Sequence, residues 1–196
     1  MKLLSEQDGS LLVHLARKAI KTYLTESKLI QPPELDEALK EKRGVFCTLK
    51  NHVNGNLRGC IGLPYPTMPL GKAVIEAAVS SATNDPRFPK MTLDEFDEVV
   101  LEITVLTPPE KLECPPEQIP EKVQTGKHGI IIKQESASGL LLPQVATENN
   151  WNSEKFLEMT CWKAGLEKNC WKESDVFLFE GQVFKETMPN GKIILE

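Results

Sequence analysis

The feature of this sequence that most constrains its fold is that its strand-forming segments come in pairs joined by short turns. Residues 45–51 and 57–62 are rich in β-forming side chains and flank Asn54-Gly55, a dipeptide that accepts the positive φ of a tight hairpin turn. Two further pairs of this kind follow, at residues 129–134 with 139–142 and at residues 176–185 with 193–195. Hairpin strands are antiparallel, because parallel neighbours need a long crossover between them. The sequence therefore predicts an α+β fold with antiparallel sheet, rather than a doubly wound parallel sheet.

Apolar side chains at helical spacing predict the helices between these strands. The stripe in residues 6–26 has Arg17 and two lysines on its other side, which is the pattern of an amphipathic helix. A second stripe predicts a helix over residues 70–83, which ends before Asp85-Pro86 because a residue that precedes proline is pushed out of the α region. Shorter helices are predicted at residues 34–42, after the capping box at 92–95, and at residues 153–164.

The charge balance and the cysteine usage narrow the functional classes. The chain of 196 residues has 23 basic and 28 acidic side chains and a net charge of −5, which argues against nucleic acid as a main partner. No stretch approaches the roughly 20 apolar residues of a membrane span, and the N-terminus turns acidic before any apolar run of signal-peptide length. Five cysteines without C-x-x-C spacing match neither a disulfide framework nor a zinc ribbon. We therefore expect a cytoplasmic protein with reduced thiols and no membrane partner.

Common catalytic and cofactor signatures are missing from the sequence. Gly126-Lys127 resembles the end of a phosphate-binding loop. That motif needs a serine or threonine after the lysine, where this chain has His128, and an upstream glycine that is missing here, so a nucleotide site of that kind is rejected. The motifs G-x-S-x-G, H-E-x-x-H and G-x-G-x-x-G do not occur. A zinc site built from Cys47, His52 and Cys60 is a minor alternative, because their spacing matches no standard ligand pattern. We therefore predict no metal and no cofactor.

Residues 57–62, with the sequence Leu-Arg-Gly-Cys-Ile-Gly, form the most informative segment. Side chains alternate along a strand, so Arg58 and Cys60 are expected on one face, where a guanidinium would favour the thiolate form of the cysteine. Two glycines in one strand reduce its stability and leave room for close backbone approach. Two interpretations follow: Cys60 is a reactive thiol, or it is a small structural residue packed between Gly59 and Gly62 at a bulge or bend.

Two further segments place polar side chains next to rigid backbone. Residues 84–89 contain Asp85 and Arg87 directly after a predicted helix, and this acid and base either pair and cap the helix end or bind a ligand. Residues 140–146 run a strand into a proline and then present Gln144, whose amide offers both a donor and an acceptor. Both segments are therefore candidates for a binding site.

The sequence resembles the AMMECR1 domain family in several blocks that occur in the family's order. Residues 57–62 read LRGCIG, the hallmark of that family, and residues 85–89 are similar to its D-P-R-F-P loop. Residues 140–151 resemble its L-L-P-Q-V-A-x-E-x-x-W segment, and residues 156–166 resemble its F-x-x-x-x-C-x-K-A-G-L helix end. The resemblance covers essentially the whole chain, and its motif positions show no departure from the family's pattern.

The resemblance implies a two-lobed α+β protein with a cleft between the lobes. A larger lobe with an antiparallel sheet is built from both termini, at about residues 1–108 and 148–196. A smaller α/β lobe is inserted at about residues 109–147, a placement taken from the proline-rich crossing at residues 108–120. In prokaryotes, family members are often encoded beside, or fused to, a Memo-family protein and a radical S-adenosylmethionine enzyme. These proteins are therefore the expected partners, and the resemblance implies no particular reaction.

The leading hypothesis is an intracellular protein that binds a small molecule or a peptide in that cleft, by itself or as an accessory to the radical-enzyme system. Cys60 would supply a thiolate for nucleophilic attack or tethering, and Arg58 or Arg87 would bind a carboxylate or phosphate. The full set of ligand-binding candidates is Arg58, Gly59, Ile61, Gly62, Asp85, Arg87, Gln144 and Glu148. Two alternatives are a non-catalytic protein–protein adaptor and a regulatory role in the transcription or translation machinery, the latter disfavoured by the acidic charge balance.

Overall fold

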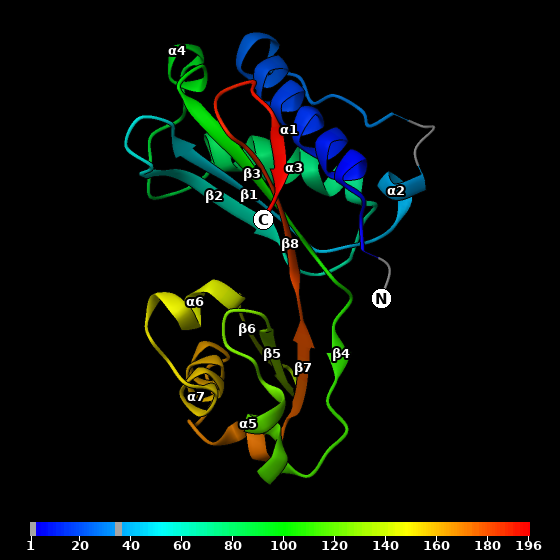
Figure 1. Cartoon of the computed structure of the whole chain (residues 1–196), viewed down its shortest axis with the longest axis vertical. Coiled ribbons are helices and arrows are strands. Elements are labelled where there is room, and N and C mark those ends of the chain that lie inside the picture. The colour runs from blue at the N-terminus through cyan, green and yellow to red at the C-terminus, as the bar shows by residue number, and fades with distance from the viewer. Residues whose placement is uncertain (1–2, 34–36) are drawn as a thin grey trace. The chain divides into compact units, whose positions relative to one another are not determined.

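The computed structural model describes residues 3–33 and 37–196, and the chain divides into two compact units. The larger unit comprises Met1–Leu106 and Gln182–Glu196, and the smaller unit comprises Thr107–Gly181. Each unit contains its own sheet and its own hydrophobic core (Figure 1). The insertion is longer than the expected residues 109–147, because the chain after residue 147 adds a long helix and a strand to the smaller unit before it returns.

The larger unit is built on a sheet with β2 at one edge. Its strands are β1 (Val45–Asn51), β2 (Leu57–Leu63), β3 (Val99–Leu106), β8 (Gly181–Glu186) and β9 (Ile193–Leu195), in the order β2-β1-β3-β8-β9. β1 is antiparallel to both β2 and β3, and β8 is antiparallel to β9. The predicted first hairpin is confirmed, and Gly55 adopts the positive φ of 71° that the turn requires. As an edge strand, β2 has backbone groups on its outer side that must find partners outside the sheet.

Helices cover one face of this sheet. They are α1 (Glu6–Glu26), α2 (Glu37–Lys40), α3 (Leu70–Thr83) and α4 (Leu93–Phe96). α1 and α3 pack side by side on the sheet (Figure 1), and Ile20, Val74 and Ile103 are fully buried between them. The helices predicted over residues 6–26 and 70–83 and the capping box at Thr92 are confirmed. Residues 34–36, at the start of the helix predicted over 34–42, lie outside the described residues.

Arg17 is buried, which corrects its expected place on the polar side of the first helix. Its side chain is 9% exposed and forms a bidentate ion pair with Glu186 of β8, with Arg17 Nε 2.6 Å from Glu186 Oε1. Arg17 Nη2 also donates to the carbonyl oxygen of Val99 (2.7 Å), and the Glu186 carboxylate accepts the N–H of Leu101 (2.9 Å). The guanidinium lies 4.7 Å from the centre of the Phe96 ring. These contacts offset the desolvation cost of burying the two charged side chains, and they connect α1 to β3 and β8.

The smaller unit has a sheet in the order β4-β7-β5-β6, with α7 packed against β5 and β6. Its elements are β4 (Glu110–Lys111), the 3₁₀ turn η1 (Pro116–Gln118), α5 (Ile119–Lys122), β5 (Gly129–Gln134), β6 (Ala137–Leu141), α6 (Pro143–Glu148), α7 (Ser153–Lys163), the 3₁₀ turn η2 (Cys170–Lys172) and β7 (Asp175–Phe179). Phe156 of α7 meets Ile130 and Ile132 of β5 in the core. The helix predicted over residues 153–164 is confirmed as α7, and Asn152 is its N-cap, since Asn152 Oδ1 accepts the Lys155 N–H (2.9 Å).

Two predictions about strands need correction. Residues 176–185, expected as one strand, form β7 and β8 with a break at Glu180, because β7 pairs with β5 in the smaller unit whereas β8 belongs to the sheet of the larger unit. The strand predicted over residues 139–142 spans Ala137–Leu141, and the residues after it form the short helix α6 with Pro143 in its first turn. Both differences depend on which segments pack or pair with these residues in the folded protein. The local sequence pattern does not contain this information.

Cys161 of α7 and Cys170 of η2 form a disulfide, so the prediction of five reduced thiols is wrong for this pair. No C-x-x-C spacing marks the two residues. They meet because the chain turns back after α7 at Gly165, which has the positive φ (75°) typical of a glycine that follows a helix end. Cys47, Cys60 and Cys114 are free.

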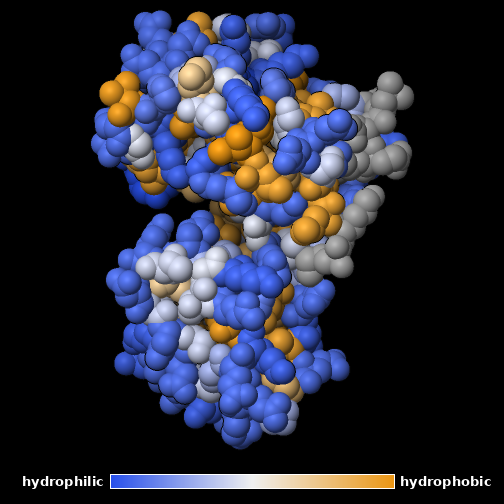
Figure 2. Space-filling model, in the orientation of Figure 1, coloured by the Kyte–Doolittle hydropathy of each residue, from blue (hydrophilic) through white to orange (hydrophobic). Residues whose placement is uncertain are grey.

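Apolar surface is distributed unevenly on the face of the molecule shown in Figure 2. Hydrophobic atoms gather on the larger unit, whereas the visible face of the smaller unit is mostly hydrophilic. The smaller unit nevertheless exposes 69% of Trp162 on α7. Within residues 3–33 and 37–196, no helix is both long enough and apolar enough to cross a lipid bilayer.

Candidate functional site

The predicted site residues of the larger unit lie together at the edge strand β2, where the loop after α3 covers its open side. The Cys60 N–H donates to Asp85 Oδ2 (2.8 Å), and Arg87 Nη2 donates to the Cys60 carbonyl oxygen (3.1 Å). The two side chains therefore replace a neighbouring strand, because they supply the acceptor and the donor that an edge strand lacks. Asp85 and Arg87 also pair with each other, with Arg87 Nε and Nη2 at 2.9 and 2.7 Å from the carboxylate oxygens.

This pairing fixes the charge of both side chains. The Arg87 guanidinium, with help from the N–H groups of Cys60 and Arg87, holds the pKa of Asp85 well below its usual range, although burial of the carboxyl group opposes the shift. The hydrogen bonds to Asp85 raise the pKa of Arg87, and the nearby Cys60 side chain adds to that shift. The Arg87 side chain is 53% exposed, whereas that of Asp85 is 2% exposed. An ion pair is thus held beside Cys60, with its guanidinium on the exposed side and its carboxylate buried.

Gly59 is required by the close approach of α3 to β2. A Cβ atom at Gly59 would lie 2.1 Å from the backbone carbonyl oxygen of Ser81 in α3. This clash could be relieved only if the helix moved away from the strand, so any residue larger than glycine is excluded here. The Ser81 hydroxyl accepts the N–H of Ile61 (2.8 Å) and therefore ties β2 to the helix. Since Gly59 faces α3 and side chains alternate, Cys60 lies on the opposite face of the sheet.

Cys60 is half-buried, with a polar and an aromatic neighbour on its face of the sheet. Its Sγ lies 3.3 Å from Thr48 Oγ1, the residue directly opposite on β1. Two residues further along, the Phe46 ring fills the space above Gly62, where a Cβ atom would come within 2.1 Å of a ring carbon. This face of the sheet therefore offers a sulfur, a hydroxyl group and an aromatic ring side by side.

Arg58 is engaged by a carboxylate of the protein itself. Its Nε and Nη2 donate to the two carboxylate oxygens of Glu95 (3.2 and 3.1 Å), and Nη2 also donates to the carbonyl oxygen of Pro89 (3.0 Å). Arg58 is the main reason why the pKa of Glu95 is lowered. The guanidinium carbons of Arg58 and Arg87 lie 5.8 and 5.6 Å from the centre of the Phe88 ring. Binding of a ligand carboxylate or phosphate by Arg58 would therefore require the pair with Glu95 to open.

The other free thiols have different environments. Cys47 is fully buried in the core of the larger unit, and this burial raises the pKa of its thiol. It lies opposite Ile61 on the α3 face, so the sulfurs of Cys47 and Cys60 are on different faces of the hairpin and do not converge as zinc ligands would. Cys114, in the smaller unit, is half-buried. Cys60 is therefore the thiol of the larger unit that combines partial exposure with a fixed neighbouring cation.

The remaining predicted residues, Gln144 and Glu148, belong to the smaller unit. They lie one turn apart on α6, so their side chains share one face of that helix, and both are exposed. Neither side chain has a hydrogen bond or ion pair to another residue in the part of the chain that the structure describes. Their expected role in orienting a ligand therefore stays a prediction.

Sequence reasoning does not identify Thr48, Ser81 or Glu95, although each contacts a predicted residue. Counting outward from the hairpin turn would place Thr48 opposite Gly59, but a bulge at Arg58 shifts the register so that Thr48 faces Cys60. The bulge therefore lies at Arg58, whereas the structural interpretation of the strand expects it at Cys60, between Gly59 and Gly62. Ser81 and Glu95 reach the site through the tertiary packing of α3 and α4, for which no local signal exists.

Comparison with known proteins identifies the family over almost the whole chain. The AMMECR1 family model matches residues 13–184. The chain belongs to the AMMECR1 family. A protein of Methanosarcina mazei is 48% identical over 199 residues, covering 99% of each chain, and the protein PYRAB00100 of Pyrococcus abyssi is 47% identical, covering 98% of this chain and 97% of its own.

A solved AMMECR1-family structure supports the fold. The crystal structure of the uncharacterized protein PH0010 from Pyrococcus horikoshii matches with a TM-score of 0.88 and 46% identity, covering 98% of both chains. The α+β fold with antiparallel sheets that the resemblance implies is therefore confirmed for this AMMECR1-family chain. The names of these relatives state no reaction, ligand or partner, so a function has to be argued from the site.

Proposed function

We propose that this AMMECR1-family protein binds an electrophilic small molecule or peptide at the β2 edge of its larger unit, with Cys60 as the nucleophile. The observation that carries the proposal is the clamp on Cys60. Its backbone N–H and carbonyl oxygen are held by Asp85 and Arg87, which leaves the half-buried sulfur in a fixed position near this ion pair and 3.3 Å from the Thr48 hydroxyl. A positive charge next to a cysteine stabilises the negative charge that develops on sulfur when it reacts.

The step needs no oxidant and no reductant. The thiol proton leaves to solvent, and the Cys60 sulfur forms a bond to the electrophilic carbon of the ligand. The leaving group of that carbon departs with the bonding electron pair and takes up a proton from water. The cleft and the partners implied by the family resemblance stay predictions, and the proposal does not depend on them.

The test is selective alkylation of the native protein with iodoacetamide between pH 6 and about 9, followed by peptide mass spectrometry. We expect Cys60 to react first, while the buried Cys47 stays unmodified and serves as an internal reference for intact fold. Cys114 is also half-buried, so its alkylation rate shows how fast a thiol of similar exposure reacts. Failure of native Cys60 to react up to pH 9, or reaction no faster than at Cys114, would remove the nucleophile from the proposal.

Three variants separate the charge of Arg87 from its clamping role. Arg87→Gln removes both, and we expect alkylation of Cys60 to slow about fivefold, the effect of one nearby charge close to the surface. Asp85→Asn weakens the clamp and also removes the negative charge that offsets Arg87, so alkylation should not slow in this variant if charge decides the rate. Arg87→Lys keeps the charge without the paired donors. Slowing in Arg87→Gln with recovery in Arg87→Lys would support the charge. Equal rates in all three variants would refute it.

A further inference from the structure

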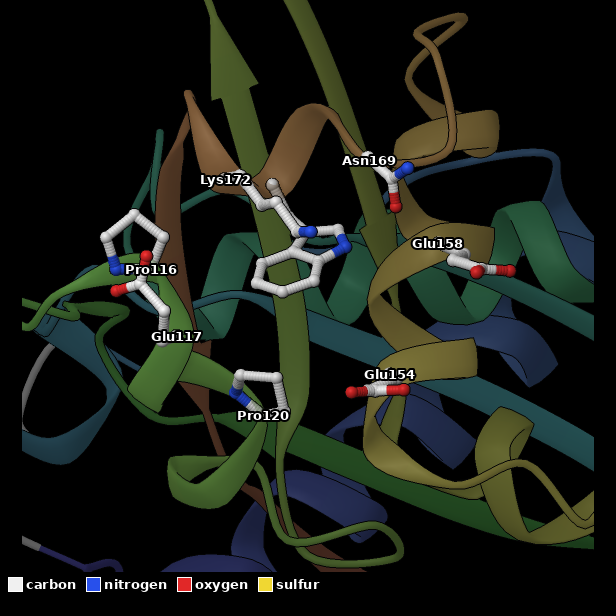
Figure 3. A pocket seen from close by; sticks show the side chains of 8 residues that line it. Pro116, Glu117, Pro120, Glu154, Glu158, Asn169 and Lys172 are labelled. Atoms are coloured by element: carbon white, nitrogen blue, oxygen red, sulfur yellow. The ribbon is translucent and has the colours of Figure 1, made fainter.

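The smaller unit contains a cavity that none of the predicted site residues lines. It has a volume of about 340 Å³, within the range in which small ligands and side chains are bound. Figure 3 shows its walls: Glu154 and Glu158 project from α7, and Pro116, Glu117 and Pro120 lie across from them on η1 and α5. Carboxylates and proline rings therefore face each other across the opening.

The cavity carries an excess of negative charge. Glu154 and Glu158 are four residues apart on α7, so their carboxylates lie on the same side of the helix, and Glu117 supplies a third from the other wall. Glu117 and Glu154 form no hydrogen bond or ion pair with any residue that the structure describes, and Glu158 accepts from Lys155 Nζ (3.0 Å). The lining thus has three carboxylates and one cation, that of Lys172, and Lys155 outside the lining pairs with Glu158. The arrangement favours a cationic ligand.

Trp171 points independently to a ligand. It lines the cavity and is 5% exposed, yet its indole Nε1 has no hydrogen-bond acceptor among the residues described. Buried indole N–H groups usually find a partner, because an unpaired donor loses its bonds to water without compensation. A ligand that brought an acceptor, such as a backbone carbonyl oxygen, would satisfy this donor.

The position of Trp171 is fixed before any ligand arrives. Its neighbour Cys170 is bonded to Cys161, so η2 is covalently attached to α7, the helix that carries Glu154 and Glu158. The Lys172 ammonium lies 5.3 Å from the centre of the indole ring, so this ring is already in contact with a cation of the protein. The aromatic group and two of the three carboxylates therefore belong to one covalently linked assembly.

We propose that this cavity binds a lysine or arginine side chain of a peptide, with the carboxylates holding the cation and Trp171 Nε1 donating to a backbone carbonyl oxygen beside it. The prolines and the indole ring would contact the aliphatic part of the side chain. A neutral or anionic group would desolvate the carboxylates without compensation. The site lies in the smaller unit, and the proposal does not depend on Cys60.

The experiment is a titration of the intact, oxidised protein labelled with ¹⁵N-tryptophan, followed by nuclear magnetic resonance. The probes are the blocked peptides acetyl-Gly-Lys-Gly-amide and acetyl-Gly-Arg-Gly-amide, with acetyl-Gly-Gln-Gly-amide as the neutral match and putrescine as a cation that lacks a carbonyl group. The chain has three tryptophans, so three indole signals are expected, and Trp171→Phe identifies the one that matters. We expect only the Lys and Arg peptides to shift the Trp171 signal downfield, with a dissociation constant of about 1 mM.

Glu154→Gln combined with Glu158→Gln tests the charge without disturbing the core. We expect the Lys peptide to bind about tenfold more weakly, since two charge-assisted contacts are lost. Glu167→Gln, an exposed carboxylate of the same unit that does not line the cavity, should leave binding unchanged. The absence of a shift at about 10 mM peptide would overturn the proposal. Equal binding of the Gln peptide or of putrescine, or unchanged binding in the double variant, would overturn it as well.

Discussion

The two units of this chain are stabilised by different links, one between distant segments and one between neighbouring segments. The larger unit combines an extensive core with the buried ion pair between Arg17 and Glu186, whose partners lie near opposite ends of the chain. The smaller unit has a smaller core, and the disulfide between Cys161 and Cys170 attaches one of its turns to α7. Small units bury a lower fraction of their surface and depend more often on a covalent link. The comparison indicates that packing carries most of the stability of the larger unit, whereas the disulfide carries a larger share in the smaller one.

The largest effect is expected from breaking the buried ion pair. Glu186→Gln leaves the Arg17 charge without its counter-charge in the core, and we expect a loss of about 3–5 kcal/mol in the free energy of unfolding of the larger unit. Denaturant unfolding measures the loss. Hydrogen exchange of amides in β1 and β3 assigns it to the larger unit, because these strands lie in the sheet that the pair supports.

A matched control is Glu26→Gln, which removes an exposed carboxylate at the end of α1, 3.6 Å from Lys28. We expect it to change stability by less than about 0.5 kcal/mol, as is usual for surface pairs. The double variant Arg17→Met with Glu186→Leu should recover most of the loss, since apolar side chains can replace a buried pair. If Glu186→Gln lowered the free energy of unfolding no more than Glu26→Gln does, the ion pair would not stabilise the larger unit.

A smaller and strictly local effect is expected from opening the disulfide. Its cysteines are nine residues apart, and a loop of that length corresponds to about 2–3 kcal/mol of stabilisation in the chain-entropy account. Reduction should lower hydrogen-exchange protection in β5 and β7 and leave β1 and β3 unchanged. The double variant Cys161→Ala with Cys170→Ala should behave like the reduced protein and show no response to the reductant. Protection in β5 and β7 that is indifferent to reduction would mean that the core alone carries the smaller unit.

The smallest effect concerns the pH dependence of the clamp at the edge of β2. Asp85 has a folded-state pKa below that of an unfolded aspartate, so its contribution to stability is present above about pH 4 and is lost as pH falls through the lowered folded-state value. We expect Asp85→Asn to cost about 1–2 kcal/mol at pH 7, reduced from a fully buried pair because Arg87 is half exposed. The difference in the free energy of unfolding between Asp85→Asn and the native protein should become smaller below about pH 4.

Denaturation curves at neutral and acidic pH measure this difference. Asp97→Asn is the matched control, because Asp97 is exposed and its side chain has no partner in the described part of the chain. The difference in the free energy of unfolding between the native protein and Asp85→Asn could also stay constant as the pH is lowered. That result would contradict the assignment of the lowered pKa to Asp85.

Several features of the fold follow from local physical chemistry. Residues 6–26 and 70–83 form helices as predicted, because their apolar stripes repeat at helical spacing. The hairpin at Gly55 forms as predicted, because glycine tolerates the positive φ of the turn. The same local logic fails at residues 176–185, where one continuous β-forming run serves two different sheets.

The candidate site shows the same division. Asp85 and Arg87 pair as one of the two interpretations expects, since they lie two residues apart in a rigid loop. That they also complete the edge of β2 depends on α3 placing the loop there. Thr48 lies opposite Cys60 only because a bulge shifts the register, and the turn alone predicts a different partner.

The amino-acid sequence by itself therefore determined the fold class, most helices and hairpins, and the segment around Cys60, because periodicity, turn residues and glycines act over a few residues. Only the tertiary structure decided that Arg17 is buried against Glu186, that Cys161 meets Cys170, and that the indole of Trp171 closes an acidic cavity. These contacts join segments whose separation along the chain carries no local signal. Their free energy becomes available only after the helices and strands have packed together.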